Sequence, residues 1–129
     1  MPALKKVMIV DDEPDIVAIM ELSLKDRGYD VGAFTIPGRA VEEIRNDRNY
    51  ALVISDVRMP EMNGFELARK VREARPDIPL VLMTAFEINK PEFAKIFPST
   101  LVSDLVKKPF SGAQLVALVR KYVGVTEQH

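Results

Sequence analysis

Five polar residues, widely spaced along the chain, combine the types needed to bind a hard cation and to attack phosphorus. They are Asp11, Asp12, Asp56, Thr84 and Lys108. Three carboxylates gathered at one place repel one another and raise the pKa of at least one of them, so such a cluster calls for a cation. Mg²⁺ with oxygen ligands suits it, because three carboxylates, one Mg²⁺ and one lysine sum to zero charge.

Asp56 is the candidate nucleophile. A carboxylate needs no deprotonation at neutral pH, so Asp56 can attack phosphorus directly and form an aspartyl phosphate. Mg²⁺ would neutralise charge on the transferring oxygens, Lys108 would supply a fixed positive donor, and the Thr84 hydroxyl would donate to a phosphoryl oxygen. The chain has no cysteine and only His129 as histidine, which argues against a zinc site and against a histidine-phosphotransfer module.

Taken singly, each candidate has an ordinary structural explanation. Asp11 and Asp12 could cap a helix that begins near Pro14, and Asp56 could serve a turn. Lys108 could be a solvated lysine. The coincidence of all of them at corresponding points of a repeated β-α pattern favours a site.

Short apolar runs alternate with stretches of helical spacing along the whole chain. Nearly continuous apolar runs are typical of parallel strands that are buried on both faces. Five β-α units with short, right-handed connections predict a doubly wound α/β domain, with five helices on both faces of one parallel sheet. If its strand order is the flavodoxin-like 2-1-3-4-5, the first and third strands are neighbours. The predicted strands are Val7–Val10, Tyr29–Phe34, Ala51–Ser55, Leu80–Met83 and Leu101–Val106.

The predicted helices lie between these runs. Pro14 suits the first turn of a helix and Gly28 ends it, while a last helix follows Ser111. A fourth helix is expected within residues Glu87 to Thr100. In the first helix, the apolar positions expected to form one stripe are Ile16, Ile19, Met20 and Leu24.

The candidate residues all follow the carboxyl ends of predicted strands. In the order 2-1-3-4-5 these ends lie on one rim, about 5 Å apart per strand, and ligands of such sheets bind where the strand order reverses. Ser55 precedes Asp56 in its strand, so its side chain should point to the opposite face, and it is assigned no role.

Four short motifs carry a family resemblance: Asp11-Asp12-Glu13-Pro14, Asp56-Val57-Arg58-Met59-Pro60 with Gly64, Thr84-Ala85, and Lys108-Pro109-Phe110. Through them the chain resembles the receiver domains of two-component response regulators over nearly its whole length. The resemblance implies that Asp12, Asp56 and the Arg58 backbone carbonyl ligate Mg²⁺ directly, with Asp11 acting through water. It also implies that Asp56 accepts phosphate from the phosphohistidine of a sensor histidine kinase, and that the Lys108–Pro109 peptide bond is cis.

The chain departs from this family at Leu105, where receivers usually carry an aromatic residue three positions before the lysine. We therefore expect phosphorylation to be read out by displacement of residues Glu87 to Thr100, which with the last helix would form the partner surface. Arg58 and Phe86 stand where receivers surround the approach of water to the phosphoryl group. The bulk of Phe86 predicts slow dephosphorylation.

Length and charge restrict the remaining possibilities. The 129 residues suit one domain, expected over residues 1–124 with a tail at 125–129. Eighteen basic and nineteen acidic side chains give a net charge of 18 − 19 = −1, which predicts no direct nucleic-acid or membrane partner. No apolar stretch approaches the about 18 residues of a membrane span, and a cytoplasmic protein is expected.

Two arrangements of a receiver remain open. The favoured one is a stand-alone receiver that acts on a protein partner, with homodimerisation on phosphorylation as an option. The alternative is the receiver of a longer regulator with a DNA-binding or enzymatic output domain. A third interpretation, a turnover hydrolase with an aspartyl nucleophile, lacks the nucleophile-x-acid spacing of that class, so the chain is not expected to be an enzyme.

Overall fold

The computed structural model describes residues 6–85 and 101–124. The strands are β1 (Lys6–Val10), β2 (Asp30–Phe34), β3 (Tyr50–Asp56), β4 (Leu80–Thr84) and β5 (Asp104–Lys107). The helices are α1 (Pro14–Lys25), α2 (Pro37–Asn46), α3 (Gly64–Ala74) and α5 (Gly112–Val123). The helix expected within Glu87 to Thr100 falls outside the described residues.

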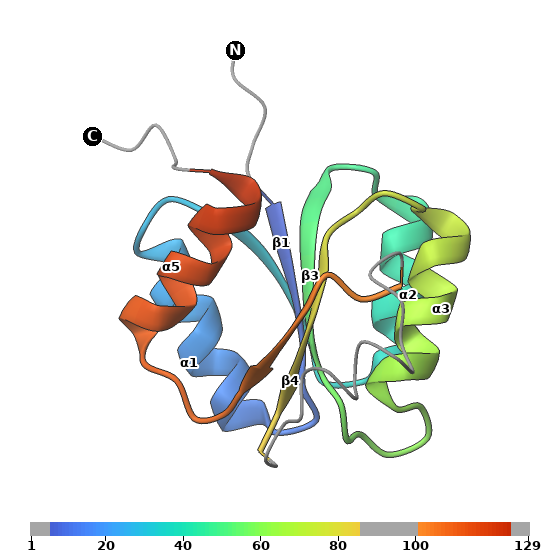
Figure 1. The fold of residues 1–129 in the computed structure, drawn as a ribbon, viewed down its shortest axis with the longest axis horizontal. Helices are drawn as coiled ribbons and strands as arrows, with labels where there is room; N and C mark the ends of the chain where they lie inside the picture. Colours follow the sequence, from blue (N-terminus) through green and yellow to red (C-terminus); the bar gives the residue numbers. More distant parts are fainter. Residues whose placement is uncertain (1–5, 86–100, 125–129) are drawn as a thin grey trace.

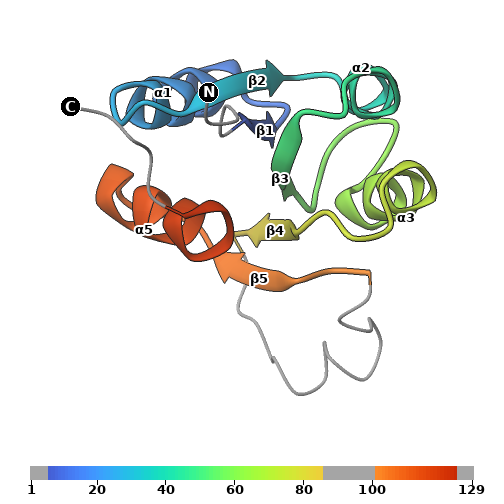
Figure 2. The ribbon, with the colours of Figure 1, turned by 90° about the horizontal axis from the view of Figure 1, so that it is seen from above.

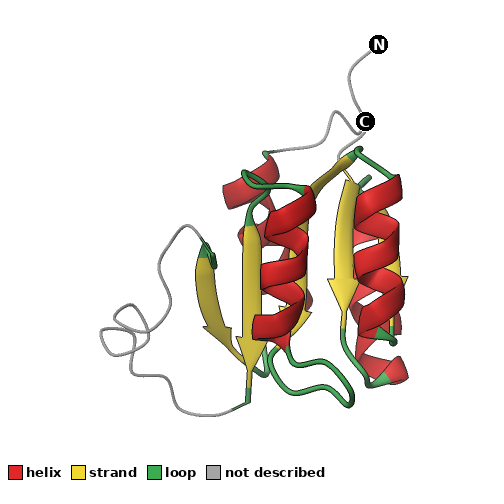
Figure 3. Cartoon of the chain, turned by 90° about the vertical axis from the view of Figure 1, so that its right-hand side faces the viewer, coloured by secondary structure: helices red, strands yellow, loops and turns green. Residues whose placement is uncertain are grey.

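The five strands form one parallel sheet in the order β2-β1-β3-β4-β5, which confirms the predicted topology. The sheet runs through the middle of the domain (Figure 1), and all five strands are labelled in Figure 2. Helices α1 and α5 cover one face of the sheet, and α2 and α3 cover the other (Figure 2). The carboxyl ends of all five strands point the same way, so the predicted rim exists (Figure 3).

Successive side chains of each strand enter two separate apolar clusters, because side chains alternate between the faces of a sheet. Met8 and Val10 belong to the cluster under α2 and α3, while Val7 and Ile9 belong to the cluster under α1 and α5. All four are fully buried. The sheet is therefore covered on both faces, as the uninterrupted apolar runs indicated.

The expected apolar stripe of α1 is wrong at one position. Ile19 is 63% exposed, and the buried positions of the helix are Val17, Met20 and Leu24. Ile19 lies about 200° around the helix from Val17, because an α-helix turns by about 100° per residue. The sequence assigns Ile19 to the stripe because it is apolar. In the structure, the buried face of α1 contains Val17 instead.

Strand β5 begins later than predicted. Pairing with β4 starts at Asp104, and just before it Ser103 accepts a hydrogen bond from the Leu80 N–H (3.0 Å) and donates its own N–H to the Leu80 carbonyl (2.8 Å). Val102, though apolar and buried, packs in the α2/α3 cluster before the strand starts. Its hydrophobicity reflects core packing and not strand pairing.

The last helix begins where the sequence indicated. Ser111 is its N-cap, and Ser111 and Gln114 form a reciprocal capping box. Within the described residues, no helix is both long enough and apolar enough to cross a lipid bilayer.

Candidate functional site

The carboxyl ends of the central strands bring the three acidic candidates together. Asp11 and Asp12 follow β1, and Asp56 is the last residue of β3, the neighbour of β1 in the sheet. One carboxylate oxygen from each of the three lies within 4.8 Å of the others. Residues 45 positions apart in the chain thus form one oxygen-rich cluster.

Lys108, which follows β5, reaches across the end of β4 into this cluster. Its Nζ lies 2.7 Å from Asp11 Oδ2 and 3.4 Å from Asp56 Oδ2. Its backbone N–H donates to the Thr84 carbonyl at 2.7 Å, which ties the start of the β5–α5 loop to the end of β4. The Lys108–Pro109 peptide bond is cis, as the family resemblance implied.

A cavity of about 240 Å³ opens over the cluster. The Asp11 side chain is fully buried, whereas Asp56 and Thr84 are buried but reach the cavity wall. Most of the residues that line the cavity carry polar or charged side chains. Its lining residues are Asp12, Glu13, Asp56, Arg58, Thr84, Ala85 and Lys108.

The electrostatics of the cluster leave an excess of negative charge. Burial raises the pKa of Asp56, and the Asp11 carboxylate raises it further, while Lys108 offsets only part of the effect. Burial alone would lower the pKa of Lys108, but its contacts with Asp11 and Asp56 outweigh burial and raise it. One lysine among three carboxylates does not balance their charge, so this donor set fits a hard divalent cation such as Mg²⁺.

Helix capping does not account for the acidic pair. The N-cap residue of α1 is Glu13, and it makes no side-chain capping hydrogen bond. Asp11 accepts the Glu13 N–H on Oδ1 at 3.0 Å and contacts Lys108 through Oδ2, so both of its oxygens have partners within the site. Asp12 contributes its carboxylate to the cluster and lines the cavity.

The loop after Asp56 is closed by short backbone hydrogen bonds. The Val57 N–H donates to the Met83 carbonyl at 2.9 Å, and the Gly64 N–H donates to the Val57 carbonyl at 2.8 Å. A Cβ atom on Gly64 would lie 2.5 Å from the Asp56 carbonyl oxygen, closer than any side chain allows. The sequence identified Gly64 only as part of a motif, and its steric role becomes visible in the fold.

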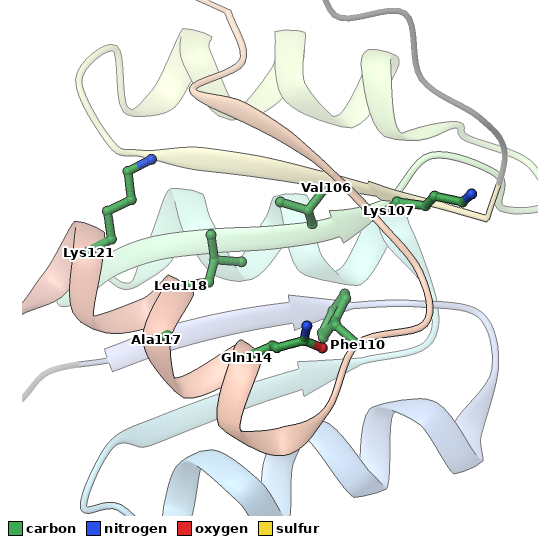
Figure 4. A pocket seen from close by; sticks show the side chains of 7 residues that line it. All are labelled: Val106, Lys107, Phe110, Gln114, Ala117, Leu118 and Lys121. Carbon is green, nitrogen blue, oxygen red and sulfur yellow. The ribbon is translucent and has the colours of Figure 1, made fainter.

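A second hollow, of about 390 Å³, lies between β5 and α5 and is separate from the acidic cluster (Figure 4). Val106, Phe110 and Leu118 provide apolar wall, and Lys121 and Lys107 stand at opposite ends of the view (Figure 4). Gln114 and Ala117 of α5 complete the lining. No charged residue of the acidic cluster belongs to it.

A doubly wound sheet of this order, with acidic residues at its switch point, is the architecture of a response-regulator receiver domain. The receiver domain family of response regulators matches residues 7–120, and the chain belongs to this family. Response regulator SaeR of Staphylococcus aureus (strain USA300) is 36% identical over 111 residues, covering 85% of this chain and 46% of SaeR. The chain thus spans about half the length of the curated relatives it matches.

Solved structures share the fold over nearly the whole chain. Chemotaxis protein CheY4 of Vibrio cholerae superposes with a TM-score of 0.82 and 27% identity, covering 93% of this chain and 99% of that one. Response regulator protein TrrA of Thermotoga maritima, solved in complex with Mg²⁺ and BeF, gives a TM-score of 0.78 and 28% identity, covering 92% and 99%.

Proposed function

We propose that Asp56 of this receiver takes a phosphoryl group from the phosphohistidine of a sensor histidine kinase, in a Mg²⁺-dependent reaction. The observation that carries the proposal is the convergence of three carboxylates and Lys108 over one cavity. The Mg²⁺–BeF complex of the relative TrrA supports the choice of metal. Asp12, Asp56 and the Arg58 carbonyl would hold the ion directly, with Asp11 acting through water.

In the transfer, a carboxylate oxygen of Asp56 attacks phosphorus while the bond between phosphorus and the histidine nitrogen breaks. The electron pair of that bond returns to the imidazole. When bound, Mg²⁺ supplies neutralising charge to the phosphoryl oxygens. Lys108, already within 3.4 Å of Asp56, provides a fixed positive donor, and Thr84 at the cavity wall offers its hydroxyl to a phosphoryl oxygen.

The product stays on the chain, so the protein acts as a switch and not as a turnover enzyme. Arg58 lines the cavity on the side of the β3–α3 loop and is expected to cover part of the approach of water. The companion position, Phe86, lies outside the described residues. We expect Phe86→Ala to shorten the lifetime of the Asp56 phosphate in a decay assay, and an unchanged decay rate would remove Phe86 from the shielding role.

The hollow between β5 and α5 is the described part of the proposed partner surface, and the segment Glu87 to Thr100 that should complete it lies outside the described residues. Position 105 on β5 is a buried leucine. Because leucine has no aromatic ring, no ring at this position can turn between exposed and buried positions. Hydrogen exchange with and without a phosphate mimic tests this readout. Protection that changes elsewhere and leaves residues 87–100 unchanged would contradict it.

Residues 1–124 form the receiver unit in this proposal, and 125–129 its tail. The favoured arrangement is a stand-alone receiver that binds a protein partner, with homodimerisation on phosphorylation as an option. The match to relatives about twice as long supports the second arrangement, a receiver joined to an output domain. The length of the natural gene product distinguishes the two.

The test of the proposed function is incorporation of phosphate from a small acyl phosphate, followed by intact mass. The parent chain should gain one phosphoryl group with Mg²⁺ and none with a chelator, and Asp56→Asn should gain none. Asp47→Asn is a matched control, because Asp47 is also paired with a lysine. Undiminished labelling of Asp56→Asn would refute the assignment, and repeated phosphate release would favour the hydrolase.

A further inference from the structure

Ser55 is a buried polar side chain without a place in the acidic cluster. Among the described residues, the buried polar or charged side chains are Asp11, Ser55, Asp56 and Thr84. The other three belong to the site, whereas Ser55 points to the opposite face of β3, where its register partners Val10 and Leu82 enter the α2/α3 cluster. A hydroxyl buried among apolar side chains is unfavourable unless it is hydrogen-bonded.

Ser55 donates its hydrogen bond to the backbone of Asp56, the proposed phosphoacceptor. Ser55 Oγ donates to the backbone carbonyl of Asp56 at 3.0 Å. The N–H of the same peptide group, on Val57, donates to the Met83 carbonyl at 2.9 Å. The peptide plane that follows Asp56 is thus held at both ends, by a side chain on one side and by β4 on the other.

This peptide controls two of the expected metal contacts. It fixes the backbone from which the Asp56 carboxylate projects, and it begins the loop that carries the Arg58 carbonyl two peptides further on. Gly64 packs against the same Asp56 carbonyl, since a Cβ there would lie 2.5 Å from its oxygen. The carbonyl therefore lies in a confined space, and the Ser55 hydroxyl is the side-chain group that holds its direction, together with the backbone hydrogen bond of Val57 on the same peptide.

We infer that Ser55 is a positioning residue for the metal site, acting through the Asp56–Val57 peptide. The inference rests on the proposed function, because it concerns how Asp56 and Arg58 are held toward one ion. Loss of the hydroxyl leaves the peptide held only through the Val57 N–H, so its carbonyl end is less ordered and part of the binding free energy of the ion is spent on ordering it. The effect should appear in metal affinity before it appears in the rate at saturating metal.

The experiment is a calorimetric Mg²⁺ titration of the unphosphorylated chain, paired with the Mg²⁺ dependence of labelling by a small acyl phosphate. Ser55→Ala should weaken Mg²⁺ binding by about fivefold, the effect of one neutral hydrogen bond. Ser55→Thr keeps the hydroxyl and should stay within about twofold of the parent. Ser55→Cys, of similar size but a weak donor, should follow Ser55→Ala and serves if the alanine variant does not fold.

Ser103→Ala is the matched control, because Ser103 also makes a 3.0 Å hydrogen bond to backbone, with the Leu80 N–H at the start of β4. It should alter thermal stability without altering Mg²⁺ affinity. Parent-like Mg²⁺ binding by Ser55→Ala and Ser55→Cys would overturn the inference, as would equal weakening by Ser103→Ala. A parent chain that binds Mg²⁺ but takes no phosphate would refute the proposed function while leaving the titration a valid test of Ser55.

Discussion

The two ends of β1 carry similar ion pairs in different surroundings. At the amino end, Lys6 Nζ lies 2.6 Å from Asp47 Oδ2, with side chains 20% and 22% exposed. At the carboxyl end, Lys108 Nζ lies 2.7 Å from Asp11 Oδ2, and the Asp11 side chain is fully buried. Distance alone therefore does not distinguish a structural contact from a reactive site.

The difference lies in how many carboxylates converge and whether each has its own partner. At the amino end, Asp47 is paired with Lys6, and Glu43 accepts the Tyr50 hydroxyl at 2.9 Å. The hydrogen bond from Lys6 lowers the pKa of Asp47, so this charge is stabilised. At the carboxyl end three carboxylates lie together and Lys108 contacts two of them, Asp11 and Asp56. Burial and the Asp11 carboxylate raise the pKa of Asp56 there. The excess of negative charge distinguishes the carboxyl end of β1, where we propose the functional site.

The largest expected effects come from two crowded glycines. Gly64 faces a backbone carbonyl, whereas a Cβ on Gly32 would lie 1.8 Å from the Tyr50 hydroxyl. Gly64→Ala and Gly32→Ala should each destabilise the fold by about 1–3 kcal/mol in denaturant unfolding. Only Gly64→Ala should also reduce labelling of Asp56, because only it displaces the Asp56 peptide.

Gly38→Ala is the control for this pair, since a Cβ at Gly38 meets nothing within 4 Å. It should leave stability unchanged or slightly increased, because alanine has the higher helix propensity. Equal loss of labelling in Gly32→Ala and Gly64→Ala would show that crowding away from the acidic cluster disturbs the site as much as crowding beside it. That result would contradict the expected difference between the two glycines.

A somewhat smaller effect is expected from Asp12. Asp12→Ala should raise the Mg²⁺ concentration for half-maximal labelling by about tenfold or more, since the loss of even a supporting group at a metal site costs 10–100-fold. Asp47→Ala should leave that concentration unchanged, because Asp47 pairs with Lys6 at the other end of β1. The measurement is labelling rate against Mg²⁺ concentration for the two variants.

The smallest expected effects are changes in folding stability on neutralising Asp56 or Asp47, and these two changes should have opposite signs. Because burial and the Asp11 carboxylate raise the pKa of Asp56, the folded state disfavours its ionised form, and Asp56→Asn should raise the metal-free stability at neutral pH. Asp47→Asn should lower stability, since the pKa of Asp47 lies below 3.8 in the folded protein. Thermal unfolding without metal measures both.

The pH dependence of stability follows from the directions of the two pKa shifts, upward for Asp56 and downward for Asp47. The raised pKa of Asp56 gives a penalty that is present above that pKa and is relieved as pH falls through it, so the advantage of Asp56→Asn should shrink in acid. The contribution of Asp47 persists to lower pH, because it is lost only as pH falls through a lowered pKa. If the stability gain of Asp56→Asn grew as the pH fell, the unfavourable ionisation of Asp56 in the folded protein would be contradicted.

Local sequence rules predicted the structure best where a residue type has one well-defined structural role, as at a helix N-cap. Ser111 with Gln114 predicted the start of the last helix, and the capping box confirms it. The same rules failed where type and position conflict. Ile19 has the right type for a core but the wrong direction on α1, and Val102 is apolar without belonging to a strand.

The amino-acid sequence by itself determined the alternation of strands and helices and the doubly wound class of the sheet, because parallel strands joined by right-handed crossovers leave few arrangements. Its resemblance to receivers supported the strand order that brings the candidate residues to one rim. Only the tertiary structure decided that Lys108 contacts Asp11 more closely than Asp56, that Gly64 packs on the Asp56 carbonyl, and that Ser55 donates to that carbonyl. These contacts depend on side-chain direction and on separations of a few tenths of an ångström, which chain order does not encode until the layers pack.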